Sequence, residues 1–150
     1  MTRELKWILL AEDDPNDAHL TKRALVDSKA PPEIVVARDG AEALDVLYHR
    51  GAFAKSESTR PCVVLLDLKM PKVNGLEVLR AIKGDPKLRT IPVVMLTSSR
   101  QERDLMESYD LGANAYVVKP VSFADFREAL REVGSFWVVI NELPPQTMVM

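Results

Sequence analysis

Residues 62–71 of the chain read Cys-Val-Val-Leu-Leu-Asp-Leu-Lys-Met-Pro, and this stretch decides the fold. The five residues before Asp67 carry no charged or hydroxyl side chain, which predicts a strand buried on both faces, as strands of parallel sheets are. The Met-Pro pair and a following Asn-Gly pair end the strand. Asp67 should therefore stand at the carboxyl end of its strand, the edge where open α/β sheets place their ligand sites.

Further apolar runs have the length of strands, and segments with helical spacing separate them. The expected strands are 7–11, 33–37, 62–66, 91–96 and 115–118. The expected helices are 15–28, 41–50, 75–83, 100–110 and 123–137, the last with Ser122 as its cap. This βαβ rhythm predicts an α/β fold with a doubly wound, five-stranded parallel sheet and five helices.

Composition restricts the class of protein. A length of 150 residues with 47% hydrophobic content suits one soluble domain. Twenty basic and twenty-two acidic residues give a net charge of −2, so we expect no direct contact with nucleic acid or a membrane surface. Cys62 lies in an apolar run and is read as a core side chain. Without a signal peptide or a membrane-length apolar run, we expect a cytoplasmic protein.

Polar residues of different kinds follow the expected strands. Glu12 and Asp13 follow the first strand and Asp67 the third, while Thr97 and Lys119 follow the fourth and fifth. Clustered carboxylates repel one another unless a cation neutralises them, and hard oxygen ligands suit Mg²⁺. Beside such a site, a hydroxyl and an ammonium group can hold phosphoryl oxygens while a carboxylate acts as nucleophile.

With these residues, the chain from 7 to about 137 resembles the receiver domain of two-component response regulators. The residues that carry the resemblance are Glu12-Asp13, Asp67 with Met70-Pro71 and Gly75, Thr97-Ser98, and Tyr116 with Lys119-Pro120. The resemblance implies a flavodoxin-like sheet with strand order 2-1-3-4-5. It also implies that Asp67 is the phosphorylation site and receives its phosphoryl group from a histidine kinase.

The resemblance assigns the metal ligands as well. Mg²⁺ is expected on Asp13, Asp67 and the backbone carbonyl of Lys69, with Glu12 assisting through water. Acidic residues at this position could also simply complement the positive end of the following helix, and that is our reading of Asp14.

The resemblance also implies roles for three residues around the phosphoryl group. Thr97 and Lys119 would contact its oxygens as catalytic residues, and Thr97 with Tyr116 would form a switch. Taken singly, Thr97 could cap a helix, Lys119 could be a solvated charge, and Tyr116 could be an ordinary half-buried tyrosine. The Lys119-Pro120 bond is expected to be cis. His19 and His49 lie in predicted helices away from the acidic edge and are given no phosphotransfer role.

A narrower resemblance rests on the long link at 51–61 and on the terminal residues Phe136-Trp137 and Leu143-Pro144. These look like the small stand-alone regulators that partner phytochrome-type histidine kinases. We therefore divide the chain into a receiver domain at 1–137 and a C-terminal extension at 138–150, a candidate dimerisation or docking tail.

The end of the last helix is more apolar than one helix face can bury, which favours an interface. The candidate interface residues are Phe136, Trp137, Val138, Val139 and Ile140. We predict a homodimer through the fourth helix, fifth strand and fifth helix; the alternative is that the tail packs on its own domain.

The sequence thus predicts a single-domain response regulator that signals to an unknown downstream protein through a protein interface or a phosphorelay. Beyond self-catalysed phosphotransfer and autodephosphorylation, we expect no enzyme activity. The alternative is a Mg²⁺-dependent phosphohydrolase with an aspartyl-phosphate intermediate, but that enzyme would want a second carboxylate where Lys69 stands. A phosphorylation-independent binding module is a third hypothesis, and the complete acceptor set disfavours it.

Overall fold

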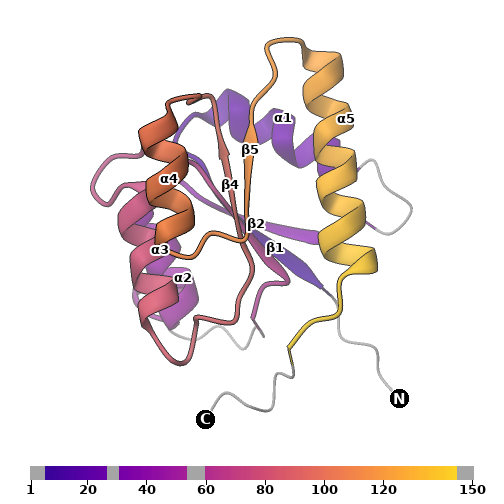
Figure 1. Cartoon of the computed structure of the whole chain (residues 1–150). Helices are drawn as coiled ribbons and strands as arrows, with labels where there is room; N and C mark the ends of the chain where they lie inside the picture. Colours follow the sequence, from indigo (N-terminus) through magenta and orange to yellow (C-terminus); the bar gives the residue numbers. More distant parts are fainter. Residues whose placement is uncertain (1–5, 27–30, 54–59, 145–150) are drawn as a thin grey trace, which may run out of the picture.

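The chain forms one parallel sheet with helices on both faces (Figure 1). The structure is a computed structural model that describes residues 6–26, 31–53 and 60–144. The strands are β1 (Trp7–Ala11), β2 (Glu33–Ala37), β3 (Val63–Leu66), β4 (Val93–Thr97) and β5 (Ala115–Val118). All neighbours pair in parallel, in the order β2-β1-β3-β4-β5. The predicted fold class and strand order are confirmed.

Helices alternate with the strands along the chain. The α-helices are α1 (Pro15–Val26), α2 (Gly40–Tyr48), α3 (Gly75–Gly84), α4 (Glu102–Asp110) and α5 (Phe123–Gly134). A 3₁₀ turn, η1 (Gly51–Phe53), follows α2, and a π-helical turn, η2 (Ser135–Ile140), continues α5. In Figure 1, α1 and α5 cover one face of the sheet, and α2, α3 and α4 lie on the other. Three expected segments lie partly outside the described residues: the end of the first helix, the link at 51–61 and the C-terminal extension at 138–150.

The central strands are buried on both faces because alternate side chains enter two separate apolar layers. One layer, with α2 and α3, takes the strand residues Leu9, Ala11, Val64 and Leu66. The other, with α1 and α5, takes Ile8, Leu10, Val63 and Leu65. Cys62 is 1% exposed and lies in the second layer, as expected of a core side chain. Burial on both faces explains why these strands read as unbroken apolar runs.

Helix starts are fixed by short polar side chains. The side chains of Asp39, Asn74 and Ser122 each accept a hydrogen bond from the main-chain amide three residues later. Such caps satisfy amides that the first helical turn leaves unpaired. Ser122 therefore has the capping role predicted for it.

The C-terminal segment packs in part on its own domain. Val138 is buried and Trp137 is half-buried, and both belong to the layer beneath α1 and α5. The Lys6 ammonium donates to the Val138 carbonyl at 2.6 Å, which ties the start of β1 to this segment. Phe136, Val139 and Ile140 remain 45%, 59% and 64% exposed. Of the five candidate interface residues, these three are therefore the exposed ones, and the interface itself stays a prediction.

Within residues 6–26, 31–53 and 60–144, no helix has the length and apolar character needed to cross a membrane.

Candidate functional site

The polar residues named from the sequence meet at one edge of the sheet because the strand ladder continues one residue past the strand ends. The Glu12 amide donates to a carbonyl of β2 at 2.9 Å, and the Asp67 amide donates to a carbonyl of β1 at 3.1 Å. The Lys119 amide donates to the Thr97 carbonyl at 2.8 Å. Main-chain hydrogen bonds therefore hold these residues side by side at the carboxyl ends of β1, β3, β4 and β5.

Three carboxylates form an acidic cluster. One oxygen from each of Glu12, Asp13 and Asp67 lies within 4.8 Å of the others. Glu12 is 3% exposed, Asp67 is half-buried and Asp13 is exposed, so the cluster opens toward solvent on one side. Oxygen ligands with room for water are the donor set that Mg²⁺ and Mn²⁺ prefer. The residues present therefore fit a hard divalent cation.

Lys119 lies against this cluster. Its Nζ atom is 2.5 Å from Oε1 of Glu12 and 3.7 Å from Oδ2 of Asp67. A further carboxylate oxygen, Oδ2 of Asp17, lies 3.2 Å away. Asp17 was not singled out from the sequence, because an acid in the first turn of a helix is ordinarily explained by the helix dipole. The lysine side chain is 11% exposed, so its contacts with the buried Glu12 and half-buried Asp67 are weakly screened by solvent, whereas Asp17 is 43% exposed.

Burial and crowding shift the ionisation of this group. Burial raises the pKa of Glu12 to about 7; the Lys119 hydrogen bond opposes the rise and the Asp67 charge adds to it. Burial by itself would lower the pKa of Lys119, but the hydrogen bond to Glu12 and the charges of Asp67, Glu12 and Asp17 outweigh it, so its pKa is raised. Lys119 is therefore a permanent ammonium group beside Asp67.

Thr97 and Tyr116 are connected through Ser99. Thr97 is 2% exposed, and its hydroxyl accepts the Ser99 amide at 3.2 Å. The half-buried Tyr116 hydroxyl donates to the Ser99 carbonyl at 3.0 Å. Burial, the largest cause, raises the pKa of Tyr116, so the phenol remains a donor at neutral pH. Sequence reasoning missed Ser99, since no local pattern marks a residue whose partners lie on other segments.

Lys69 lies between two open hollows beside the acidic cluster. One hollow, of about 440 Å³, is lined by Lys69 together with Asp13, Met70, Asn74 and Asp104, among others. The other, of about 320 Å³, is lined by Lys69, Asp67, Thr97 and residues 98–101. The Lys69 side chain is exposed. A small donor molecule therefore has solvent access to Asp67 past Lys69.

The predicted cis bond before Pro120 is wrong. No peptide bond in residues 6–26, 31–53 or 60–144 is cis, so Lys119-Pro120 is trans. The two isomers of a bond to proline differ by only about 0.5–1 kcal/mol, so a Lys-Pro pair by itself does not determine the isomer.

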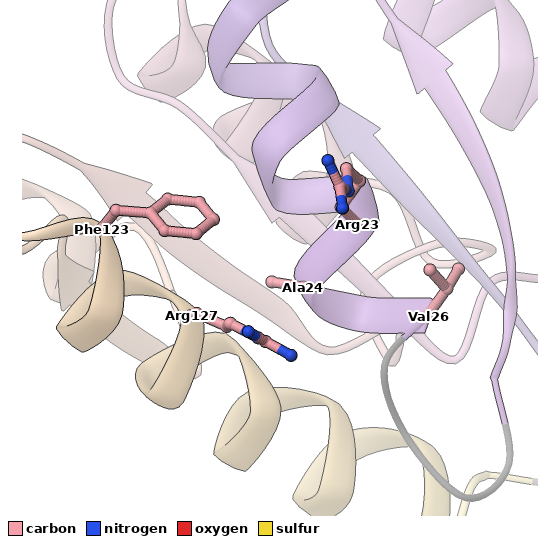
Figure 2. Close-up of a pocket in the computed structure, with 5 residues that line it drawn as sticks. All are labelled: Arg23, Ala24, Val26, Phe123 and Arg127. Carbon is pink, nitrogen blue, oxygen red and sulfur yellow. The ribbon is translucent and has the colours of Figure 1, made fainter.

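A further hollow lies between α1 and α5, away from these carboxylates. It has a volume of about 370 Å³ and is lined by Arg23, Ala24, Val26, Phe123 and Arg127. Figure 2 shows Phe123 and Arg127 on α5 across from the three residues of α1. None of its lining side chains belongs to the acidic cluster, so it is a separate surface feature of mixed basic and apolar character.

This fold and this site define a receiver domain. The family model described as the response regulator receiver domain matches residues 8–131, and the chain belongs to that family. It is a response regulator of the two-component signalling class.

Individual relatives can be aligned with this chain over nearly its whole length. Response regulator Rcp1 of Synechocystis sp. is 40% identical over 139 residues, 93% of each chain. A crystal structure of the Mn²⁺-bound form of Rcp1 has a TM-score of 0.86 at 39% identity, covering 93% of this chain and 99% of that one.

Several similar structures are named for phytochromes. The phosphorylated cyanobacterial phytochrome response regulator RcpA has a TM-score of 0.88 at 40% identity, covering 95% of this chain and 100% of that one. The bacteriophytochrome response regulator AtBRR is 56% identical, with a TM-score of 0.75 and coverage of 93% and 100%. The chain is thus related to phytochrome response regulators.

Proposed function

We propose that this chain is a cytoplasmic, Mg²⁺-dependent phosphoacceptor that takes a phosphoryl group onto Asp67. The observation that carries the proposal is the position of the Lys119 ammonium, 3.7 Å from Asp67 and next to a three-carboxylate cluster. An ammonium group beside a nucleophilic carboxylate can stabilise the charge that a phosphoryl group brings. That the relative RcpA has a phosphorylated form supports a phosphoacceptor role.

In the proposed transfer, an Asp67 carboxylate oxygen attacks the phosphorus of a phosphohistidine or an acyl phosphate. A phosphorus–oxygen bond forms to Asp67, and the bond to the donor nitrogen or oxygen breaks, leaving the electron pair on the donor. Lys119 stabilises the phosphoryl oxygens by charge, and the Thr97 hydroxyl donates to one of them. Glu12 and Asp13, with Asp67 and the Lys69 carbonyl, would hold Mg²⁺, which supplies charge neutralisation for the incoming phosphoryl oxygens.

We propose that a sensor histidine kinase donates the phosphoryl group. The names of RcpA and AtBRR support a phytochrome-type kinase. The added charge on Asp67 would draw Thr97 toward the new oxygens and so alter Tyr116 and the surface of α4 and β5, where a downstream protein would respond. No second carboxylate follows Asp67 at the position of Lys69, so we do not favour the phosphohydrolase.

The test is labelling with radioactive acetyl phosphate and Mg²⁺. We expect the parent chain to be labelled, Asp67→Asn to lose the label, and Lys119→Met and Thr97→Ala to be labelled much more slowly. Chelation of the cation should stop labelling of the parent. Asp110→Asn, a change of the same kind at the exposed end of α4, is the matched control and should behave as the parent. If Asp67→Asn is labelled as strongly as the parent, the proposal is wrong.

We also propose that the chain dimerises through the α4, β5 and α5 face, with the extension at 138–150 contributing. The exposed apolar side chains of Phe136, Val139 and Ile140 support this, because together they form an apolar surface next to α5. Sedimentation should show a dimer for the parent and a monomer for Val139→Ser with Ile140→Ser. Val26→Ser, on an exposed valine of α1 outside the α4, β5 and α5 face, is the control. A monomeric parent at all concentrations would end this part of the proposal.

A further inference from the structure

Ser99 uses each of its polar groups to join a different part of the site. Its amide donates to the Thr97 hydroxyl at 3.2 Å, and its carbonyl accepts from the Tyr116 hydroxyl at 3.0 Å. Its own hydroxyl donates to Oδ2 of Asp104 at 2.6 Å. The residue is half-buried, which shields these bonds from competing water. Thr97, Tyr116 and α4 therefore meet at one residue.

Asp104 supplies the link to the helix. It lies in the first turn of α4 and is half-buried, and its main-chain carbonyl accepts a hydrogen bond from the fully buried Ser108. Among the described residues, the side chain at the cap position, Gln101, makes no capping bond. Instead, the Ser99 hydroxyl accepts the Gln101 amide at 3.3 Å. The Ser99–Asp104 bond is the shorter of the two and is strengthened by the carboxylate charge, and it joins the β4–α4 loop to the first turn of α4.

The three bonds of Ser99 determine how the loop responds when the Thr97 hydroxyl moves. If Thr97 turns toward phosphoryl oxygens on Asp67, it gives up the bond from the Ser99 amide. Ser99 then remains tied to Asp104 and Tyr116, so those two bonds determine how far the loop moves and which segments move with it. A loop without the Asp104 bond would be joined to α4 only through the chain itself and the weaker bond from the Gln101 amide.

We propose that Ser99 and Asp104 are positioning residues that transmit the movement of Thr97 to Tyr116 and α4. This rests on the proposed phosphorylation of Asp67 for its trigger, while the linkage itself exists in the unmodified chain. Neither residue touches the reacting atoms. Their role is to couple the position of the β4–α4 loop to the position of the Thr97 hydroxyl.

The first measurement uses the unmodified full-length chain. Carbon-13 labelling of tyrosine gives signals from Tyr48, Tyr109 and Tyr116, and Tyr116→Phe identifies the last of them. We expect Ser99→Ala and Asp104→Asn to move the Tyr116 signal. Ser99→Thr, which keeps the hydroxyl, should restore the parent spectrum. Glu102→Gln, an equal charge change on an exposed residue in the same turn of α4, is the matched control and should leave the signal unchanged.

The second measurement adds acetyl phosphate and Mg²⁺ and normalises the Tyr116 response to the amount of label on Asp67. Loss of a hydrogen bond to a charged group corresponds to about a ten- to hundredfold smaller population shift per labelled molecule in Ser99→Ala. Asp104→Asn keeps an acceptor oxygen but loses the charge, so we expect a smaller reduction of the same sign. Parent-like responses in both labelled variants would overturn the positioning role. An unlabelled parent would instead overturn the phosphoacceptor proposal, while the first measurement would still test the linkage.

A double-mutant cycle guards against a variant that is merely destabilised. In the Asp104→Asn background, Ser99→Ala should change the Tyr116 signal little further, because the bond is already weakened. Independent, additive changes in the two backgrounds would contradict a shared link.

Discussion

The main-chain oxygen of Asp67 lies so close to Gly75 that a methyl group on Gly75 would come within 2.0 Å of it. The Gly75 amide also donates to the Leu68 carbonyl at 2.8 Å, so the start of α3 is packed directly against the loop that carries the acceptor. We predict that Gly75→Ala lowers the free energy of unfolding by about 1–3 kcal/mol or more, because the obstacle is backbone and cannot rotate away. It should also slow the labelling of Asp67 by acetyl phosphate.

The matched control for Gly75→Ala lies at the other end of the same helix. A methyl group on Gly84 would meet no atom of the described residues within 4 Å. Gly84→Ala should therefore raise stability by up to about 1 kcal/mol, the difference in helix propensity between the two residues. Urea denaturation of both variants checks the pair. If both variants changed the free energy of unfolding equally, the close approach to Asp67 would not be the reason that position 75 requires glycine.

Thr21 offers a stabilising substitution. It is fully buried in α1, and its hydroxyl has no hydrogen-bond partner among the residues that the structure describes. Thr21→Val keeps the shape and removes the unpaired group, so we expect about 1 kcal/mol of added stability, or roughly 2–4 °C in Tm. Thr90→Val is the control, because the Thr90 hydroxyl is exposed and accepts from Arg60 at 2.9 Å. A thermal melt in which Thr21→Val falls below the parent would contradict the prediction.

Asn114 joins β4, β5 and α3 through one oxygen. Its Oδ1 accepts the Val93 amide at 2.8 Å and the Lys83 ammonium at 3.0 Å. Removing it leaves the amide of a buried residue without this acceptor, so Asn114→Ala should cost about 1–3 kcal/mol in chemical denaturation. Asn114→Asp keeps an acceptor at the same place and should recover most of the loss. Equal losses in both variants would mean that the backbone around position 114, and not the acceptor oxygen, accounts for the effect.

Cys62 gives a prediction about pH. Burial raises the pKa of its thiol to about 11 from an ordinary value of 9.0, with Lys6 opposing the rise. Between these two pH values the folded chain binds more protons than the unfolded chain, so stability is fully present below about pH 9 and falls as pH approaches 11.

The measurement for Cys62 is the difference in unfolding free energy between the parent and Cys62→Ala. The parent should lose about 1–2 kcal/mol relative to the variant between pH 9 and pH 11, since each pH unit in such a window corresponds to about 1.4 kcal/mol. Comparison with the variant cancels the titration of tyrosine and lysine. A difference that does not change with pH would show that the thiol is not held neutral by burial.

The sequence predicts the sheet and the cluster at its edge because both depend on local pattern. The apolar run followed by Asp67 marks the end of a strand, and this can be recognised from neighbouring residues alone. Parallel strands bring their carboxyl ends to one edge of the sheet. Local pattern places Glu12 and Lys119 at strand ends, as it does Asp67. That Lys119 lies beside Asp67, with the two groups 3.7 Å apart, was expected only from the resemblance to receiver domains, which implied the strand order.

The sequence does not reveal contacts that depend on how loops and helix ends are oriented in the folded chain. Ser99 and Asp104 lie five positions apart, but their bond depends on how the β4–α4 loop turns. Asp17 reaches Lys119 only because α1 begins beside the end of β5. Val138 likewise packs against its own domain because of the orientation of η2. The apolar character of the segment does not by itself indicate that orientation.

The hydrogen bonds from the Glu12, Asp67 and Lys119 amides have a consequence for exchange with solvent. They extend the sheet ladder one residue past β1, β3 and β5. In hydrogen–deuterium exchange these three amides should be protected for as long as the strand amides, although their side chains lie at an open edge. This prediction attaches the reacting groups to backbone that opens only when the sheet itself opens.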